Sequence, residues 1–581
     1  MKKVEIEDCK IFGKIGFIVM LFFLSFGFSY AQAPNQQGFE IMKNLDIYSN
    51  VIKELSQDYV DDINPGELTQ TGIEAMFESL DPYTNFIPES QVEDYKFITT
   101  GQYGGIGALI HQQGEYVVIS EPYEGSPAQK AGLKAGDKIL EINGKVAKGK
   151  SYDDVSSFLK GQSGTTVNLL VQREGYPTPF EKTITREIIK IDNIPYYGMV
   201  DKHIGYIKIT GFTQNAAKEM RQAFLKLKET NELKGIIIDV RGNGGGLLNE
   251  AVDIANIFVE RGQEIVSTKG KMADKNRTHM TMNPPVDLSI PVVVLVDRSS
   301  ASASEILAGS LQDLDRAVVI GQRTFGKGLV QNVVPLSYNA QMKITVAKYY
   351  IASGRCIQAI DYAHKKKDGT FGKIPDSLIR AFKTKNGRTV YDGGGINPDV
   401  ITKPRRFSSL ALALYSKYLI FDFATAFARE HASIKPANVF EISDSIFGGF
   451  LEYIKDKDYS YTTKSERALE VLKAEATREN YYEAMRTEYD LLKGRMEADK
   501  KDDLKKYKDQ VEELLKMEIV TRYYYQKGKI EAALNQDPDL DLAITTINDP
   551  EKFSAILSGK YVQPKPEIPV RSDNEDEEID E

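Results

Sequence analysis

The sequence predicts a multi-domain α/β protein, and three features of the chain support this fold class. Over residues 184–350, apolar strand-like runs alternate with amphipathic segments of helix length, as in a sheet covered by helices. Short strands and glycine turns dominate residues 101–175, whereas residues 407–560 are charged and mostly helical. The length of 581 residues also exceeds what one hydrophobic core usually organises, so several domains are expected.

The N-terminal segment predicts export. The apolar run "IGFIVMLFFLSFGF" follows four lysines and precedes the small-residue stretch "SYAQA". This order is typical of a secretory signal peptide, here over residues 1–31 with cleavage after Ala31. The acidic residues Glu5, Glu7 and Asp8 are unusual ahead of such a run. A retained membrane anchor is therefore the alternative.

Composition narrows the classes of function. The formal net charge of −9 disfavours a nucleic-acid-binding protein, because such proteins usually carry a basic balance. The two cysteines, Cys9 and Cys356, provide neither a disulfide framework nor a thiolate zinc site. We expect no metal and no cofactor.

The elements follow one another in a definite order. Helical spacing over 39–100 ends at the proline-marked turn "LDPYTNFIPES". The α/β region then supplies the strands "HIGYIKI", "GIIIDV", "PVVVLVD", "RAVVIG" and "QMKITVAKYYI". Its helices are "AAKEMRQAFLKLKET", "LLNEAVDIANIFVE" and "SEILAGSLQDL".

Three further segments follow or interrupt this core. Residues 361–392 are basic and polar and predict an insertion loop. The helical region 407–560 would dock a partner, form a homo-oligomer or substrate cage, or act as a passive bundle. Residues 561–581 combine a proline-spaced linker with an acidic tail, which predicts disorder.

A serine-rich turn marks the first candidate site. The strand "PVVVLVD" runs into "RSSASASEILAGSLQDL", which places Ser302 at or near a helix N-terminus. Free N–H groups and the helix dipole there favour negative charge, as an attacking serine and its oxyanion require. The structural alternative is that Ser302 and Glu305 form a capping box. That alternative explains one serine well but not the whole Ser-Ala-Ser-Ala-Ser run.

A lysine 25 residues later is the candidate base. Lys327 lies in "GQRTFGKG", which resembles a phosphate-binding loop but has Gly328 where a hydroxyl is required. The following "GLVQNVVPL" predicts a strand instead of the helix that such a loop needs. A lysine with a lowered pKa can serve as the base for a serine. A surface lysine is the alternative, and a histidine base is a second one, although none of the five histidines has a recognisable catalytic context.

Two glycine-rich turns offer backbone N–H groups. "GIIIDVRGNGGGLLNEAV" ends a strand in four glycines, so Gly245 or Gly246 is a candidate oxyanion donor, and a plain tight turn is the alternative. The turn "YGGIG", with Gly104, Gly105, Ile106 and Gly107, is a candidate site for a peptide carboxylate. The strand after it offers an edge for β-addition of that peptide. Its alternative is an ordinary small β-domain.

In this order, these segments resemble the carboxyl-terminal processing, or tail-specific, proteases. "GSPAQKAGLKAGDKILEINGK" resembles a PDZ domain, with "YGGIG" as its carboxylate-binding loop. "SASASEILAGSLQD" resembles the family's nucleophile segment, and "GQRTFGKGLVQ" the segment that carries its lysine base. "LDPYTNFIPES", "AKYYIASGRCIQ" and "GGGINPDV" resemble stretches before the PDZ domain and at the end of the catalytic core. The similarity covers roughly residues 40–403.

The resemblance implies an inserted PDZ domain over 101–178 and a crotonase-like ββα serine protease core over 184–403. Ser302 would be the nucleophile and Lys327 the general base. Gln331 and Glu305 would orient this pair, and the oxyanion hole would consist of the N–H groups of Ala303 and Gly245.

The implied function is that of an exported serine endopeptidase in the periplasm or cell envelope of a bacterium. Its PDZ domain would capture the C-terminus of a protein substrate, and a Ser-Lys dyad would cleave upstream through an acyl-enzyme. The alternative is a non-catalytic PDZ scaffold of the cell envelope.

Overall fold

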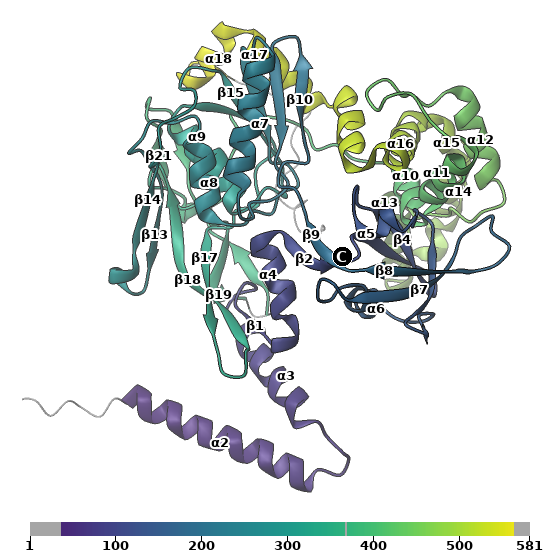
Figure 1. Ribbon diagram of the computed structural model, residues 1–581, viewed down its shortest axis with the longest axis horizontal. Helices are drawn as coiled ribbons and strands as arrows, with labels where there is room; N and C mark the ends of the chain where they lie inside the picture. Colours follow the sequence, from purple (N-terminus) through teal and green to yellow (C-terminus); the bar gives the residue numbers. More distant parts are fainter. Residues whose placement is uncertain (1–35, 367–368, 563–581) are drawn as a thin grey trace, which may run out of the picture. The chain divides into compact units, whose positions relative to one another are not determined.

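The computed structural model describes residues 36–366 and 369–562 (Figure 1). The predicted signal peptide, Cys9 and all but the first two residues of the predicted acidic tail lie outside these residues. The described chain forms two units, one ending at Phe86 and one beginning at Ile87.

The first unit is helical, as the sequence predicts. It contains α2 (Gln36–Asp58) and α3 (Pro65–Glu78), and β1 (Asn85–Ile87) begins at its end. Helix α3 starts with proline, whose missing N–H costs nothing at that position. The Asn64 side chain caps it by accepting a hydrogen bond from the Gly66 N–H at 3.0 Å.

The second unit begins with short elements that lead into a small β-domain. These are η1 (Glu89–Gln91), α4 (Val92–Thr100) and β2 (Gln102–Gly105), and β2 pairs with β9 (Glu187–Lys190). The domain's strands are β3 (Ala108–Gln113), β4 (Tyr116–Pro122), β5 (Lys138–Ile142), β6 (Lys145–Val146), β7 (Thr166–Gln172) and β8 (Phe180–Thr185). Its helices are α5 (Pro127–Lys130) and α6 (Tyr152–Leu159).

The sheet of this domain has an edge strand at each end. The strands follow the order β3-β4-β5-β7-β8, and β6 pairs with β5. Buried apolar side chains of both sheet and helices form one core, including Ile106, Val117, Ile139, Val155 and Leu169. Because β3 lies at the end of this order, its outer edge is available for another strand.

A second sheet organises the α/β region and follows the order β10-β11-β12-β15-β16-β23. Its strands are β10 (Tyr196–Asp201), β11 (Ile204–Lys208), β12 (Gly235–Asp239), β15 (Val292–Val296), β16 (Ala317–Gly321) and β23 (Val400–Ile401). All neighbours from β11 onward are parallel, and β10 pairs antiparallel with β11. Every residue of β12, β15 and β16 is buried, as expected for strands covered on both faces.

One face of this sheet is covered by the three predicted core helices, α7 (Ala216–Thr230), α8 (Leu248–Ala255) and α9 (Ala303–Asp313) (Figure 1). Ile236 and Ile238 of β12 point to this face, whereas Ile237 between them points to the other. Side chains alternate in this way because the strand period is two. The predicted strands and helices of the core are thus confirmed, although α8 is shorter than the sequence pattern.

The opposite face is covered by the end of the chain. Helices α17 (Pro538–Asn548) and α18 (Pro550–Leu557) bury Leu540, Ala543, Ile547 and Ile556 against the strands. The sequence pattern assigns these residues to the C-terminal helical region, but they complete the core of the α/β domain.

An antiparallel sheet flanks the core. It contains β17 (Leu329–Pro335), β18 (Gln341–Ile351), β13 (Glu264–Gly270) and β14 (Arg277–Met280), paired in this order, and η2 (Ala273–Lys275) connects the last two. The segment 361–392, predicted as a loop, contains two short antiparallel pairs. These are β19 (Ile360–Lys365) with β20 (Phe371–Lys373), and β21 (Ala381–Lys383) with β22 (Thr389–Tyr391), with η3 (Asp376–Leu378) between them.

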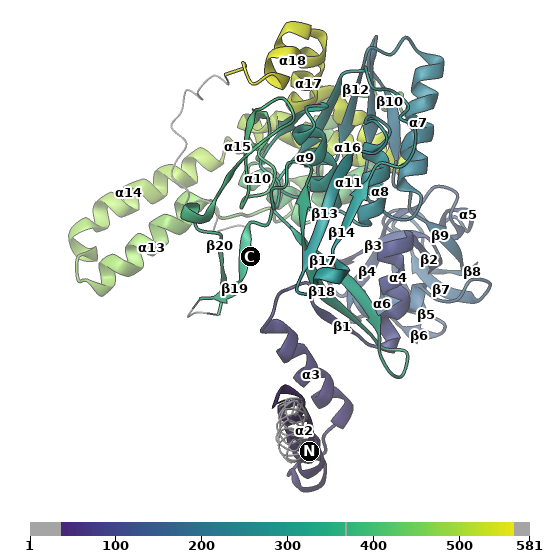
Figure 2. The ribbon, with the colours of Figure 1, turned by 90° about the vertical axis from the view of Figure 1, so that its left-hand side faces the viewer.

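The helical region has a core of its own. It contains α10 (Ser409–Ser416), α11 (Leu419–Glu430), α12 (Asp444–Ile454), α13 (Lys464–Arg478), α14 (Tyr482–Lys500), α15 (Asp503–Lys506) and α16 (Lys508–Ala533), followed by η4 (Leu534–Gln536). Helices α13 and α14 lie side by side as a hairpin (Figure 2). Helix α16 is broken at Tyr525, where φ is 53°.

Within the described residues, no single helix has the length and apolar composition needed to cross a membrane. The bent pair α10 and α11, at 59° to each other, reaches both criteria when taken together. Both helices contribute buried side chains to the helical core, among them Leu414 and Phe423.

Candidate active site

Ser302 lies directly before α9, at the place that the sequence predicts. The helix dipole of α9 favours an anion beside Ser302, although the second and third N–H groups of the helix donate to the Ala301 carbonyl oxygen and the Ser302 side chain. Ser302 has φ 56° and ψ −113°, a conformation that costs a non-glycine residue about 1–3 kcal/mol. Such strain is concentrated at functional sites, which favours a role for Ser302 beyond capping the helix.

The carboxylate of Glu305 joins the serine segment to the lysine segment. Its Oε2 accepts hydrogen bonds from the N–H groups of Ser302 (2.8 Å) and Lys327 (2.9 Å). Its Oε1 accepts from the Gly326 N–H (2.8 Å) and the Thr324 hydroxyl (2.6 Å). The contact with Ser302 is one half of the predicted capping box, and both halves of that box are present. The other three contacts of Glu305 serve a different purpose. One of them holds the Lys327 N–H on the same oxygen atom as the Ser302 N–H, and the other two hold the lysine segment on Oε1.

Burial and hydrogen bonding have opposite effects on Glu305. Because the side chain is fully buried, its pKa is raised to about 7, and the donated hydrogen bonds limit this rise. Above this pH the carboxylate can accept all four hydrogen bonds. Below it, the added proton occupies one lone pair.

Tyr349 of β18 makes a second connection between the two segments. Its hydroxyl contacts the Ser302 carbonyl oxygen at 3.3 Å and also the Lys327 carbonyl oxygen. Tyr349 is 1% exposed. Sequence reasoning did not single out Tyr349 or Thr324. Tyr349 lies in "AKYYIASGRCIQ", but nothing in that pattern indicates where its hydroxyl points.

Glycines on both sides of Lys327 allow its turn to pack closely. Gly326 has φ 88°, and a Cβ there would lie 2.4 Å from the Ala359 Cβ. The Gly328 N–H donates to Gln358 Oε1 at 2.7 Å. Strand β17, not a helix, follows the turn, so the phosphate-loop interpretation is wrong. Lys327 is half-buried.

The glycine loop after β12 lies against the serine turn. A Cβ on Gly245 would lie 2.7 Å from the Ala301 carbonyl oxygen and 2.9 Å from the Ala303 nitrogen, so only glycine allows this approach. The Gly245 N–H donates to Asn243 Oδ1 at 2.9 Å. A substrate oxyanion would therefore have to replace or share that bond. Gly246 pairs with Phe212 in an isolated parallel bridge.

Asn243 is another residue that the sequence reasoning missed. It is 1% exposed, and its Nδ2 donates to the Ile209 carbonyl at 2.9 Å. Its own carbonyl accepts hydrogen bonds from the Ala301 N–H (3.1 Å) and the Ser304 hydroxyl (2.8 Å). Asn243 thus links β11, the glycine loop and the serine turn.

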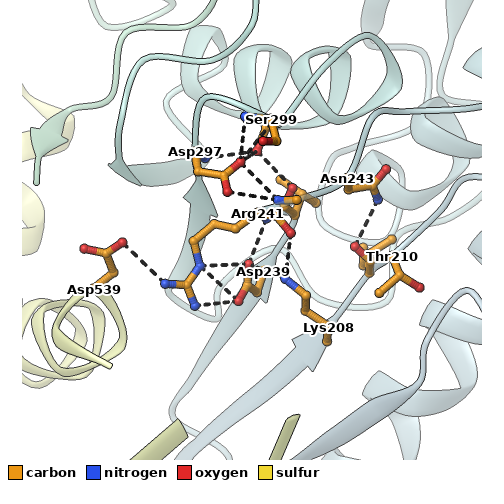
Figure 3. Close-up of polar contacts among 12 residues, drawn as sticks. Lys208, Thr210, Asp239, Arg241, Asn243, Asp297, Ser299 and Asp539 are labelled. Carbon is orange, nitrogen blue, oxygen red and sulfur yellow. Dashed lines mark hydrogen bonds and ion pairs between the residues drawn. The ribbon is translucent and has the colours of Figure 1, made fainter. Parts of the chain in front are cut away.

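Asp297 organises the turn between β15 and Ser302 (Figure 3). Its Oδ1 accepts hydrogen bonds from the N–H groups of Ser299 and Ser300, both at 3.0 Å. The same atom accepts the Gly242 N–H at 3.0 Å. One carboxylate therefore holds both the serine turn and the start of the glycine loop.

Gln331 lies on β17, four residues after Lys327. Its Nε2 donates to Thr345 Oγ1 at 3.2 Å, across the pair formed by β17 and β18. The predicted role of Gln331 in orienting the serine and lysine stays a prediction.

The predicted carboxylate-binding loop leads from β2 into the open-edged strand β3. Gly104 and Gly105 belong to β2, and the Gly104 carbonyl accepts the Gly161 N–H at 3.0 Å. The Ile106 side chain is buried in the small β-domain, and its carbonyl accepts the Ala128 N–H at 2.8 Å. Gly107 has φ 75°, a conformation that favours glycine.

The five histidines contact residues outside the serine turn. The ring nitrogens of His111, His203, His364 and His431 contact Ser120, Glu232, Asp361 and Phe427, respectively. His279 lies in β14, where it pairs with Val266 of β13. None of these contacts includes the serine turn, which weakens the histidine alternative.

Three family models match parts of the chain. Peptidase family S41 matches residues 203–364, and the PDZ domain matches residues 118–173. The C-terminal helical domain of probable PDZ-proteases matches residues 410–547. A peptidase core combined with these two modules defines a PDZ-containing peptidase.

Curated relatives agree with this class. The carboxy-terminal-processing protease of Bartonella bacilliformis is 35% identical over 322 residues, which is 55% of this chain and 73% of the relative. CtpA of Bacillus subtilis, a carboxy-terminal processing protease, is 30% identical over 438 residues, 74% of this chain and 90% of the relative. The chain therefore belongs to the carboxy-terminal processing proteases of peptidase family S41.

The solved structures that the chain matches include the photosystem II D1 C-terminal processing protease. It is 28% identical, with a TM-score of 0.34, over 61% of this chain and 86% of that one. A putative S41 protease from Bacteroides fragilis is 19% identical, with a TM-score of 0.35, over 51% and 80% of the two chains.

Proposed function

We propose that the protein is an exported serine endopeptidase that cleaves with Ser302 as nucleophile and Lys327 as general base. The observation that carries this proposal is the shared Glu305 Oε2, which accepts one hydrogen bond from the backbone of each residue. The parallel sheet with α7, α8 and α9 on one face supports a crotonase-like ββα core.

The reaction would proceed in two halves. The Ser302 hydroxyl attacks the scissile carbonyl while Lys327 takes its proton, which requires a neutral amine at the moment of attack. The tetrahedral intermediate collapses to an acyl-enzyme, and Lys327 returns the proton to the leaving amine. Water then attacks the acyl group with Lys327 again as base, which releases the second product and restores Ser302.

The N–H groups of Ala303 and Gly245 would stabilise the oxyanion. The first belongs to the first residue of α9, and the second lies against the serine turn. Donors positioned before the reaction contribute strongly to catalysis, and the Gly245 N–H would have to share or leave its hydrogen bond with Asn243 Oδ1 to take part.

The PDZ domain would supply the substrate. The open edge of β3 supports addition of an extended peptide, and the loop of Gly104, Gly105, Ile106 and Gly107 would receive its terminal carboxylate. Capture of the tail raises its effective concentration at Ser302. Location in the periplasm or cell envelope rests on the N-terminal sequence pattern.

Cleavage of an unstructured peptide with an apolar, free C-terminus tests this function. We expect the full chain to cleave it, and Ser302→Ala and Lys327→Arg to be slower by about 10³-fold or more. Arginine cannot act as the base because it keeps its proton near neutral pH. An amidated copy of the peptide is the matched control and should show a raised KM.

Two outcomes would contradict the proposal. Equal cleavage by Ser302→Ala would require another nucleophile. An intact substrate after incubation with the wild-type chain would favour the non-catalytic PDZ scaffold.

A further inference from the structure

Arg241 lies between β12 and the glycine loop that would supply the oxyanion donor. Its backbone N–H donates to Asp239 Oδ1 at 2.8 Å, and its carbonyl accepts from Lys208 Nζ at 2.7 Å. The next residue, Gly242, donates its N–H to Asp297. The position of Arg241 therefore sets where the loop begins.

The guanidinium of Arg241 bridges the sheet and the end of the chain (Figure 3). On one side, Nη2 contacts Asp239 Oδ2 at 2.6 Å and Nε contacts Oδ1 at 3.1 Å. On the other side, Nη1 and Nη2 bind the two carboxylate oxygens of Asp537 at 3.0 and 2.5 Å. Nη1 also contacts Asp539 Oδ2 at 3.3 Å. Two bidentate pairs fix both the position and the plane of an arginine fork.

Asp537 and Asp539, the acidic pair, are themselves held in place. Asp537 caps α17 by accepting hydrogen bonds from the N–H groups of Asp539 (3.1 Å) and Leu540 (3.2 Å). One turn further on, α17 is packed into the core through Leu540 and Ala543. The cap and the packing of α17 thus place the two carboxylates beside the sheet.

The charges of this cluster depend on the acidic pair. Lys208 and Arg241 face three carboxylates, those of Asp239, Asp537 and Asp539. Of these, Asp239 is buried, with 1% of its surface exposed. Without the charges of Asp537 and Asp539, two cations would share one buried carboxylate. The half of the guanidinium that faces α17 would then lose its anionic partners.

We propose that Asp537 and Asp539 are positioning residues for catalysis, which act through Arg241 on the glycine loop and its oxyanion donor. This inference rests on the proposed function. It assigns to the C-terminal segment a part in the active site, about 300 residues away in sequence, although neither aspartate touches substrate. Catalytic geometry is sensitive to displacements on the order of 0.5 Å, so a small shift at the loop base lowers turnover.

The test compares Asp537→Asn/Asp539→Asn with Asp541→Asn in the full chain. Asparagine caps a helix about as well as aspartate, so the substitution removes charge and keeps the cap. Asp541 lies exposed on the same helix, and within the described residues its carboxylate forms no ion pair with Arg241. The measurements are kcat and KM for the peptide, the affinity of a peptide aldehyde, and the thermal unfolding midpoint. The aldehyde forms a tetrahedral adduct with Ser302 that places an oxygen at the oxyanion site.

We expect the double variant to lose about tenfold or more in kcat, with KM within about twofold of wild type. Aldehyde affinity should fall by a similar factor, and Asp541→Asn should behave as wild type. The inference is overturned if the double variant matches Asp541→Asn in kcat and aldehyde affinity. It is also overturned if the unfolding midpoint falls while both catalytic measures are kept.

Asp537→Asn alone is measured in the same way if the double variant does not fold, and the same two outcomes apply. Ser302→Ala separates this inference from the proposed function. If Ser302→Ala retains cleavage, the proposed function fails. If Ser302→Ala is inactive and the aspartate variants are fully active, only this inference fails.

Discussion

At the scale of single residues, the site depends on groups that act on the backbones of Ser302 and Lys327. Glu305 accepts hydrogen bonds from both N–H groups, and the Tyr349 hydroxyl contacts both carbonyl oxygens. Each catalytic candidate is thereby held by the same two side chains. Neither Glu305 nor Tyr349 needs to touch substrate for this effect.

The ionisation of Glu305 predicts an acid limb in the pH profile of kcat. Its pKa is raised to about 7, so lowering the pH through this value protonates the carboxyl and removes an acceptor from the network. Activity should be present above about pH 7 and decline below it. Thr324→Val removes one donor to the charged form, so the pKa should rise further, and the limb should move up by about one pH unit.

Thr324→Ser keeps the hydroxyl and is the matched control, with a limb expected at the wild-type pH. Initial rates at saturating substrate from about pH 5 to 9 measure the midpoint. If the acid limb of Thr324→Val has the same midpoint pH as that of wild type, a group other than Glu305 controls it.

Tyr349→Phe should lower kcat and leave KM nearly unchanged. The phenol hydroxyl is the buried donor next to two carbonyls, and losing such a partner costs about 1–3 kcal/mol, or about 5- to 160-fold in rate. Tyr350→Phe is the control, because Tyr350 is the half-buried neighbour and its ring lies 4.7 Å from the Lys269 ammonium. Steady-state kinetics of both variants provide the comparison. Equal kcat values would show that the Tyr349 hydroxyl is dispensable.

At the scale of elements, the candidate active site lies where three chain turns meet at one end of a parallel sheet. The glycine loop follows β12, the serine turn follows β15, and the lysine turn follows β16. Neighbouring parallel strands bring their carboxyl ends to the same edge, where open α/β sheets commonly bind ligands. Glycine at selected positions allows these turns to approach one another.

Gly245→Ala should reduce kcat by about 10²-fold or more, because its Cβ would collide with the serine turn and displace the oxyanion donor. The φ of Gly245 is 104°, which also disfavours alanine. Gly244→Ala is the matched control, since a Cβ there meets no atom within 4 Å. We expect the control to stay within about threefold of wild type by the same kinetic assay. Similar rates for both variants would argue against close packing of Gly245.

At the scale of the whole molecule, the C-terminal segment is part of the peptidase core. Ile237, Val293, Leu295, Val318 and Ile320 face α17 and α18, and each is 0% exposed. Exposing five such side chains costs on the order of 10 kcal/mol, since each contributes about 1.5–3 kcal/mol when buried. This is comparable to the total stability of a typical domain.

A chain truncated before α17 should therefore be insoluble or unfolded, whereas a chain ending after Val562 should keep its fold. Soluble yield and the circular dichroism melting curve of the two truncations measure the difference. A soluble, cooperatively melting protein without α17 and α18 would show that the strands are stable with one face uncovered.

Much of the fold follows from local pattern. The β-branched runs of β12, β15 and β16 predict buried strands, and the amphipathic spacing of α7 predicts its full span. The β-branched residues of β17 likewise predict a strand, which argues against a phosphate loop. Segment 361–392 is harder to predict, because its short strands pair only with each other and carry weak apolar alternation.

The residues of the candidate site also fall into two groups, those that the sequence marks and those that only the structure reveals. Ser302, Lys327, Gly245 and Glu305 can be selected because small residues, a helix start and glycine turns mark them in the sequence, and a family resemblance supports them. Their chemical roles stay proposals. Thr324, Asn243 and Tyr349 cannot be selected, because their hydrogen bonds join segments that are tens of residues apart.

Local residue preferences thus determine the strands, the helices and the turns that carry the candidate serine and lysine, because each depends on neighbours within a few positions. The tertiary structure alone decides that Glu305 holds Ser302 and Lys327 on one oxygen atom. It alone decides that α17 covers the second face of the sheet and that Asp537 reaches Arg241. The contacts of α17 and Asp537 depend on how the chain returns to the sheet after some 300 residues, and no periodicity within a segment encodes that distance.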